Sequence, residues 1–110
     1  MAEFKLLING QLVAGDATMD VINPATEETV ATCARASIAQ LDQAVAAAKA
    51  AFPAWSKTSI DTRRAALIAM ADAIQANVPE LARLLTQEQG KPLEAAMGEI
   101  FGASAFFRYF

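Results

Sequence analysis

The stretch SIAQLDQAVAAAKAAFPAW, residues 37–55, marks the point where the sequence changes from a strand-forming to a helix-forming composition. Ser37 and Gln40 have the spacing of a capping box, in which each side chain satisfies a backbone N–H at the start of a helix. Apolar residues then recur at steps of three and four, the period of one helical face: Leu41, Ala44, Val45, Ala48 and Phe52. Because proline lacks the N–H that continues a helix, Pro53 is predicted to end this one, with Trp55 in the following connection.

Residues 1–36, before this helix, are predicted to form short strands and hairpins. Asn9-Gly10 is a dipeptide that accepts positive φ at both central positions of a type I′ turn. The runs 6–8 and 11–13 flank this dipeptide, and we therefore expect a two-stranded hairpin there.

Two further extended segments are expected in the same part of the chain. Residues 19–22 form a short run that stops at Asn23-Pro24, because the residue before a proline is pushed out of the helical region. Residues 29–36 contain β-branched side chains that favour a strand. The predicted fold class is therefore α+β, with N-terminal β-hairpins followed by three to four helices over residues 37–110.

Two more helices are predicted in the middle of the sequence. The first begins near Ser59, and its apolar stripe consists of Leu67, Met70, Ala71 and Ile74. The next covers Glu80–Gln89, after Pro79, which suits a first helical turn. Its buried residues are expected to be Leu81, Leu84 and Leu85. Gly90 is a natural C-terminal stop.

The last helix is predicted to run from about Leu93 to the final residue, with Pro92 in its first turn. It finishes in the segment Phe106-Phe107-Arg108-Tyr109-Phe110, with no C-terminal glycine or closing proline. An exposed aromatic end of this kind favours association. We therefore expect residues 1–110 to be a single incomplete segment of a larger protein, whose remaining chain covers this end.

The composition disfavours several classes of function. The net charge is −3 and the charged residues are interspersed, which disfavours binding to nucleic-acid phosphates. No apolar run approaches the length that a membrane span needs, and no signal-peptide core follows Lys5. The single cysteine, Cys33, excludes an internal disulfide framework. We therefore expect a cytoplasmic protein without a nucleic-acid or membrane partner.

The sequence also lacks the residue sets of most catalytic sites. It contains no histidine, which excludes Ser–His and Cys–His pairs and histidine metal sites. Cys33 lies among small apolar residues in a predicted strand, which is typical of a structural cysteine. Gly90-Lys91-Pro92 lacks the upstream glycine and the leading strand of a phosphate loop. These residues alone predict no catalytic role.

Six segments nevertheless occur in an order and at a spacing typical of one family. They are 8–10 with 13–15 (Ile-Asn-Gly and Val-Ala-Gly), 21–26 (Val-Ile-Asn-Pro-Ala-Thr), 44–48 leading to 51–55 (Ala-Phe-Pro-Ala-Trp), Arg63 or Arg64 before Leu67, 81–92 ending in Glu-Gln-Gly-Lys-Pro, and Glu99-Ile100 before the aromatic end. Together they resemble the N-terminal region of the NAD(P)-dependent aldehyde dehydrogenase superfamily. The Glu-Gln-Gly-Lys-Pro form is similar to that of succinate-semialdehyde and related dehydrogenases.

The resemblance implies a protein several times longer, with a Rossmann-type cofactor domain, a catalytic domain and an oligomerisation arm. Residues 1–110 would form the N-terminal part of the cofactor-binding domain. Their partners would be the rest of the polypeptide, the aldehyde substrate and further copies in a dimer or tetramer. The catalytic cysteine, the glutamate base, the oxyanion-hole asparagine and the residues that bind NAD or NADP would all lie beyond Phe110. Cys33 does not match the context of the catalytic cysteine.

Five residues are carried over from the resemblance. The carbonyl of Ile22 and the carboxylate of Glu88 match positions that bind a monovalent cation beside the cofactor domain, with a salt bridge or a helix-end charge as the alternative for Glu88. Gly102 and Phe106 match the wall of the aldehyde entry tunnel, with core packing as the alternative. Glu99 matches a position near the tunnel mouth, with an interhelical ion pair as the alternative.

The resemblance thus predicts a piece of an enzyme that oxidises an aldehyde to a carboxylate, with the 110-residue piece itself non-catalytic. In such an enzyme a cysteine thiolate attacks the carbonyl, NAD(P)⁺ accepts a hydride and water activated by the glutamate releases the acid. The alternative is a free-standing helical interaction module without enzymatic activity. A continued reading frame after Phe110 and self-association through the terminal phenylalanines distinguish the first interpretation from the second.

Overall fold

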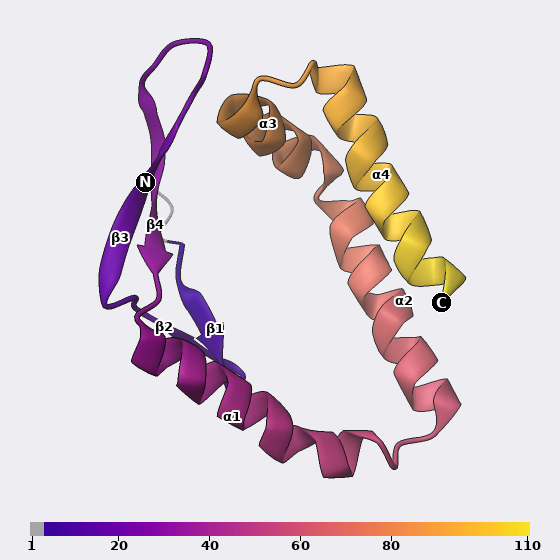
Figure 1. The fold of residues 1–110 in the computed structure, drawn as a ribbon. Coiled ribbons are helices and arrows are strands. Elements are labelled where there is room, and N and C mark those ends of the chain that lie inside the picture. The colour runs from indigo at the N-terminus through magenta and orange to yellow at the C-terminus, as the bar shows by residue number, and fades with distance from the viewer. Residues whose placement is uncertain (1–3) are drawn as a thin grey trace. The chain divides into compact units, whose positions relative to one another are not determined.

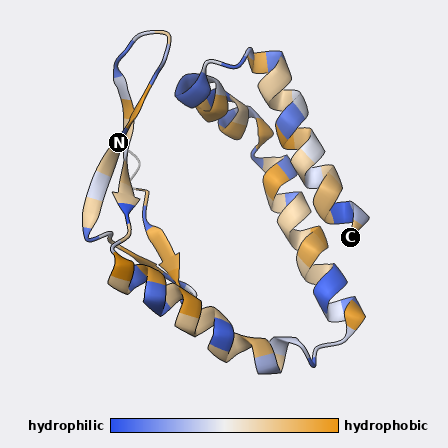
Figure 2. Cartoon of the chain, in the orientation of Figure 1, coloured by the Kyte–Doolittle hydropathy of each residue, from blue (hydrophilic) through white to orange (hydrophobic). Residues whose placement is uncertain are grey.

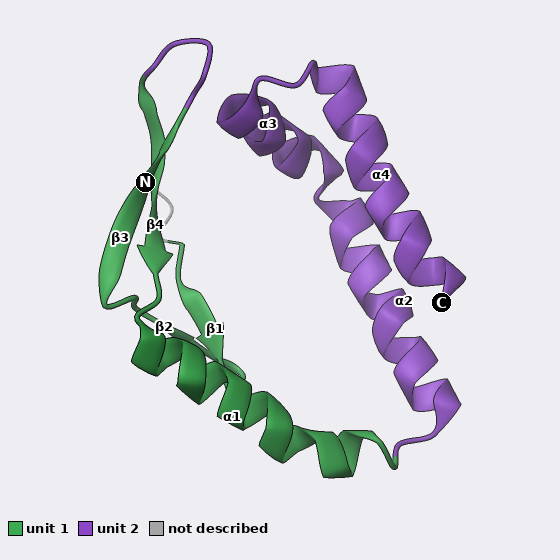
Figure 3. Ribbon diagram, in the orientation of Figure 1, with its two compact units in different colours: residues 1–22, 28–57 green, residues 23–27, 58–110 purple. Residues whose placement is uncertain are grey.

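The computed structural model describes residues 4–110 and arranges four strands before four helices along the chain (Figure 1). The predicted order of hairpins followed by helices is therefore confirmed. The chain divides into two compact units (Figure 3). The first consists of the chain up to Ile22 together with Glu28–Lys57, and the second of Asn23–Glu27 together with Thr58–Phe110. Membership of both units in one cofactor-binding domain stays a prediction.

The first hairpin joins β1 (Leu6–Ile8) to β2 (Gln11–Val13) in antiparallel register, with Ile8 opposite Gln11. Asn9 and Gly10 form its turn with φ values of 52° and 74°. Both values lie in the left-handed region that a type I′ turn requires, and the hairpin predicted from this dipeptide is confirmed.

The second hairpin joins β3 (Ala17–Ile22) to β4 (Thr29–Arg35), also in antiparallel register. Strand β3 begins two residues earlier than the prediction, because Ala17 pairs with Arg35 and Thr18 with Ala34 across the sheet. A cross-strand hydrogen bond of 2.8 Å from the Thr32 hydroxyl to the Asp20 carboxylate adds a side-chain contact.

Helix α1 (Ile38–Trp55) begins with the capping box that its sequence predicts: the Gln40 N–H donates to the Ser37 hydroxyl at 3.2 Å, and the Ser37 N–H donates to Oε1 of Gln40 at 3.2 Å. The predicted stop at Pro53 is wrong, because the helix continues to Trp55. A proline in the last turn removes only one backbone hydrogen bond, and the Ser56 N–H still reaches the Phe52 carbonyl at 2.8 Å.

The large apolar side chains of α1 remain exposed within the described residues, and Phe52 is 65% exposed. Figure 2 shows hydrophobic residues along much of this helix. The exposed members are Ile38, Leu41, Val45, Phe52 and Trp55. These large apolar side chains are therefore not part of the buried core of the described chain.

Three helices make up most of the second unit: α2 (Ile60–Ala76), α3 (Val78–Gln89) and α4 (Leu93–Tyr109). The Ser59 hydroxyl caps α2 by accepting from the Thr62 N–H at 3.1 Å. Gly90 ends α3 with a φ of 76°, and its N–H donates to the Thr86 carbonyl at 2.8 Å. The predicted starts and ends of these helices agree with the structure to within two residues, and none of the helices in residues 4–110 is both long and apolar enough to cross a membrane.

Small residues form the buried core of this unit. Ala71 of α2, Ala82 of α3 and Ala96 of α4 are each 0% exposed, and Val78 is also buried. The prediction that the leucines of α3 are buried is wrong: Leu81, Leu84 and Leu85 are only half-buried, and Met70 of the predicted α2 stripe is exposed. Alanine at the contact points lets helices approach closely, which leaves the longer side chains at the edge of the interface.

Candidate functional site

One face of α4 carries an open apolar hollow of about 430 Å³. Its lining residues recur at steps of three and four and therefore share one side of the helix. They are Gly102, Ala105, Phe106, Tyr109 and Phe110. Gly102 and Phe106 are two of the three residues carried over to the substrate tunnel, and the helix brings them into the same hollow.

Gly102 leaves room in this hollow because it has no side chain. A Cβ built at Gly102 meets no atom within 4 Å, so close helix packing does not require glycine there. Phe106, one turn further on, is 70% exposed. This surface can take an apolar group, and it offers no charged side chain to one.

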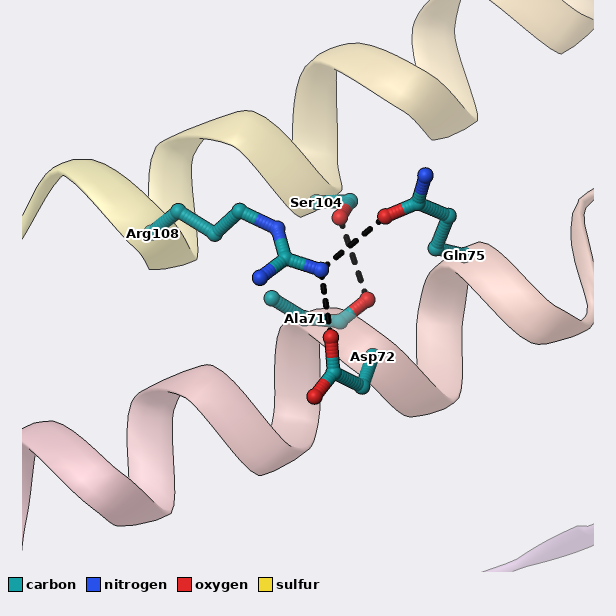
Figure 4. A network of polar contacts seen from close by, with 5 residues as sticks. All are labelled: Ala71, Asp72, Gln75, Ser104 and Arg108. Carbon is teal, nitrogen blue, oxygen red and sulfur yellow. Dashed lines mark hydrogen bonds and ion pairs between the residues drawn. The ribbon is translucent and has the colours of Figure 1, made fainter.

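A polar network holds a different side of α4 against α2 (Figure 4). The Ser104 side chain is buried at 3% exposure, and its hydroxyl donates to the Ala71 carbonyl at 3.0 Å. One turn further along, Nη2 of Arg108 forms an ion pair with the Asp72 carboxylate and donates to Oε1 of Gln75 at 3.0 Å. Sequence reasoning missed this network, although the four-residue spacing of Ser104 and Arg108 places both on one side of a helix.

Glu99 does not line the hollow. Its carboxylate forms an ion pair with Lys91, in the connection between α3 and α4. Lys91 belongs to the segment Gly90-Lys91-Pro92 that the sequence singled out. The ion pair joins the first half of α4 to this connection. The alternative role expected for Glu99 from the sequence was an interhelical ion pair, and the partner in the structure is a loop residue instead of a residue of another helix.

A second hollow, of about 510 Å³, lies between the beginning of α2 and the end of α4. Three arginines and one acidic side chain line it together with apolar groups: Ile60, Asp61, Arg63, Arg64, Leu67, Arg108, Tyr109 and Phe110. In the sequence, the adjacent Arg63 and Arg64 are typical of a solvated helix face or a salt bridge. The tertiary structure adds Arg108 from a helix more than forty residues away in sequence.

The two residues carried over to a cation site lie in different units: Ile22 ends β3 in the first, and Glu88 lies near the end of α3 in the second. Both are exposed within the described part of the chain. Within the second unit, a Cβ added to Gly90 would lie 3.2 Å from Cγ of Pro24. The Asn-Pro segment and the Gly-Lys-Pro segment are therefore neighbours there.

Cys33 lies in the middle of β4, half-buried and opposite Met19. The Ala34 N–H beside it donates to the Phe4 carbonyl at 3.0 Å. Among residues 4–110, no cluster of three or more cysteine, aspartate or glutamate side chains is placed to hold a metal ion. A half-buried strand position opposite Met19 is compatible with the structural role predicted for Cys33.

The model of the aldehyde dehydrogenase family matches residues 12–110. The chain belongs to this family. It is 44% identical over 99 residues to the mitochondrial methylmalonate-semialdehyde/malonate-semialdehyde dehydrogenase (acylating) of Rattus norvegicus, covering 88% of this chain and 18% of that protein. It is also 44% identical over 99 residues to the 3,6-anhydro-alpha-L-galactose dehydrogenase of Streptomyces coelicolor, covering 90% and 20%. The chain thus spans about a fifth of these aldehyde dehydrogenase relatives.

Solved structures of the family contain the same arrangement of strands and helices. PnpE in complex with nicotinamide adenine dinucleotide matches with a TM-score of 0.91 and 36% identity, covering 98% of this chain and 23% of that chain. A point mutant of the Staphylococcus aureus betaine aldehyde dehydrogenase, in complex with NAD⁺, matches with a TM-score of 0.90 and 31% identity, covering 96% and 22%. Residues 4–110 therefore have the fold of an aldehyde dehydrogenase segment.

Proposed function

We propose that this chain is the N-terminal portion of an NAD(P)-dependent enzyme that oxidises an aldehyde to a carboxylate, and that the portion itself is a non-catalytic scaffold. The match of residues 12–110 to the aldehyde dehydrogenase family is the observation that carries this proposal. The chain spans only about a fifth of the length of its relatives, which supports the scaffold role, since the other four fifths of such an enzyme can hold the reactive groups.

The scaffolding role is supported by the exposed apolar side chains of α1. Phe52 is 65% exposed and Trp55 is 48% exposed, while the buried hydrophobic residues of the described chain are alanines and one valine. Such a small buried core supplies little stability, because the hydrophobic contribution grows with the apolar area removed from water. In our proposal these side chains pack against the rest of the enzyme.

The second element of the proposal is that Gly102 and Phe106 form part of the wall along which the aldehyde enters. The support is their shared apolar hollow, which suits an uncharged organic group. Glu99 would stand near the mouth of this passage, where its pairing with Lys91 removes a free negative charge from the path.

A cation site that uses the carbonyl of Ile22 and the carboxylate of Glu88 is the third element. Oxygen ligands suit a hard monovalent cation. Its support is the resemblance of the Asn-Pro and Gly-Lys-Pro segments to the cation-binding segments of the family. Further oxygen ligands would come from outside this chain.

The nicotinamide cofactor, when bound, supplies a hydride acceptor. Among residues 4–110, the hollow on α4 presents apolar groups, and the sequence contains no glycine-rich loop between a strand and a helix of the kind that holds a nucleotide phosphate. We therefore assign no residue of this chain to NAD or NADP.

We further propose that the full-length enzyme is cytoplasmic and forms a dimer or a tetramer. Cell fractionation tests its location, and light scattering tests its oligomeric state.

Activity assays on two proteins test the main proposal. The purified 110-residue chain is expected to show no NAD(P)-dependent oxidation of aldehydes, whereas the full-length protein is expected to reduce NAD⁺ or NADP⁺ when an aldehyde is added. Turnover by the short chain above a no-protein background would refute the scaffold role. A full-length protein that oxidises no aldehyde, or a reading frame that ends at Phe110 in a monomeric chain, would favour the interaction module.

A further inference from the structure

The polar contacts that join α4 to α2 lie on one side of α4, and the residues that line the apolar hollow lie on another. Successive residues of an α-helix are about 100° apart around its axis, so Gly102 and Phe106 each lie about 160° from Ser104. A rotation of α4 about its axis therefore moves Ser104 and the hollow together. Whatever holds Ser104 in place also determines where Phe106 points.

Ser104 is suited to hold the helix because its hydroxyl is buried and bonded. It is 3% exposed and donates to the Ala71 carbonyl at 3.0 Å, beside an alanine that is 0% exposed. A serine in this place has a directional contact that an apolar residue of the same size lacks. The bond therefore favours one rotation and one axial position of α4 over their neighbours.

Arg108 adds a second constraint one turn further along the same side (Figure 4). Its guanidinium contacts Asp72 and Gln75, which follow Ala71 within about one turn of α2. A planar guanidinium that bridges two partners restrains orientation more strongly than a single ion pair does. Two contacts on consecutive turns of α4 restrain its rotation together more than either one does alone.

We propose that Ser104 and Arg108 are positioning residues for the aldehyde passage: their bonds to Ala71, Asp72 and Gln75 set the rotation of α4 and thereby the place of Phe106 in the passage wall. This inference rests on the proposed function of that wall. Ser104 does not contact the substrate in this role. Aldehyde selectivity then depends on Asp72 of α2, although Asp72 does not line the apolar hollow.

The test uses the full-length enzyme with acetaldehyde and octanal as a small and a long apolar probe. Ser104→Ala and Asp72→Asn are each expected to raise the KM for octanal by about tenfold relative to that for acetaldehyde, with little change in kcat. Arg108→Gln is expected to act in the same direction, and Arg108→Lys to recover part of the loss because its ammonium still pairs with Asp72. Arg83→Gln, an exposed arginine of α3, is the matched control and is expected to leave both KM values unchanged.

Phe106→Ala separates the positioning role of Ser104 and Arg108 from the proposed aldehyde passage on which it rests. Phe106→Ala should itself change the ratio of the two KM values if Phe106 lines the passage. If it does so while Ser104→Ala and Asp72→Asn leave the ratio unchanged, or lower kcat equally for both aldehydes, the positioning role is overturned and the passage stands. If Phe106→Ala leaves the ratio unchanged, both the passage and the positioning role are overturned.

Discussion

The side-chain amide of Gln40 donates a hydrogen bond of 2.9 Å to the carbonyl of Ala14. The Oε1 atom of the same amide accepts from the Asp16 N–H at 3.0 Å and from the Ser37 N–H at 3.2 Å. One side chain therefore caps α1 and also joins its N-terminus to the loop between β2 and β3. The capping box predicted from the sequence has a tertiary role that its spacing did not indicate.

Replacing Gln40 is expected to destabilise the first unit in a graded way. Gln40→Ala removes all of these side-chain bonds and is expected to lower the free energy of unfolding by about 1–2 kcal/mol. Gln40→Glu keeps the acceptor oxygens and loses the donor to Ala14, so we expect a smaller loss. Urea unfolding of the full-length protein measures both, with Gln43→Ala, on an exposed position of α1, as the control. Equal losses for the alanine and glutamate variants would contradict a role for the bond to Ala14.

Gly15 lies so close to β4 that no other residue fits without a shift of backbone. A Cβ at Gly15 would lie 2.6 Å from the Arg35 carbonyl oxygen and 2.8 Å from the Ala17 carbonyl oxygen. Gly15→Ala is therefore expected to lower the free energy of unfolding by about 1–3 kcal/mol, as overpacking does. Gly98→Ala, where a Cβ meets nothing within 4 Å, is the matched control in the same unfolding experiment. The prediction fails if the two variants unfold at the same denaturant concentration.

Gly102 permits a test of the passage wall that does not disturb packing. Because a Cβ there meets no atom within 4 Å, Gly102→Ala is expected to stabilise α4 slightly, by up to about 1 kcal/mol through helix propensity. At the same time the added methyl group narrows the apolar hollow, and we expect a higher KM for long aldehydes in steady-state assays. Gly98→Ala shares the propensity gain and does not line the hollow. Identical kinetics of the two variants would speak against Gly102 as a wall residue.

Gly90 is constrained by its backbone conformation as well as by its surroundings. Its φ of 76° costs an L-residue about 1–2 kcal/mol, and a Cβ would lie 3.2 Å from Cγ of Pro24. Gly90→Ala is therefore expected to lower the melting temperature of the full-length protein, whereas Gly90→Asn, which tolerates this φ better, is expected to lower it less. Calorimetry compares the two, and a larger drop for asparagine would implicate the contact with Pro24 rather than the backbone.

Local chemistry made most of the elements predictable. The Asn9-Gly10 turn, the Ser37 capping box and the Gly90 stop each depend on conformations of a few neighbouring residues, and each is present in the structure. Pro53 was misjudged because the effect of a proline depends on how many helical bonds remain after it. Near the end of a helix that number is small.

The burial of individual residues was less predictable than the elements. Leu81 belongs to an apolar stripe, yet Ala82 beside it is the buried residue. Which side chain is buried depends on the distance and the crossing angle between two helices. The apolar period of a single helix predicts neither of these quantities. The predicted apolar stripe of α1 is not buried in the described chain, where its large side chains, such as Phe52, are exposed.

The sequence by itself determined the order of strands and helices and their caps, because each of these depends on residues close together in the chain. It indicated the family as well, because six segments spread over the chain occur in the order and at the spacing typical of it. It also indicated that Gly102 and Phe106 lie on one helical face, since they are four residues apart. Only the tertiary structure decided that Ser104 bonds to Ala71, that Arg108 pairs with Asp72 and that Gly15 lies against Arg35. These contacts join residues 20 to 36 positions apart, and their partners are selected by the packing of whole elements rather than by any local pattern.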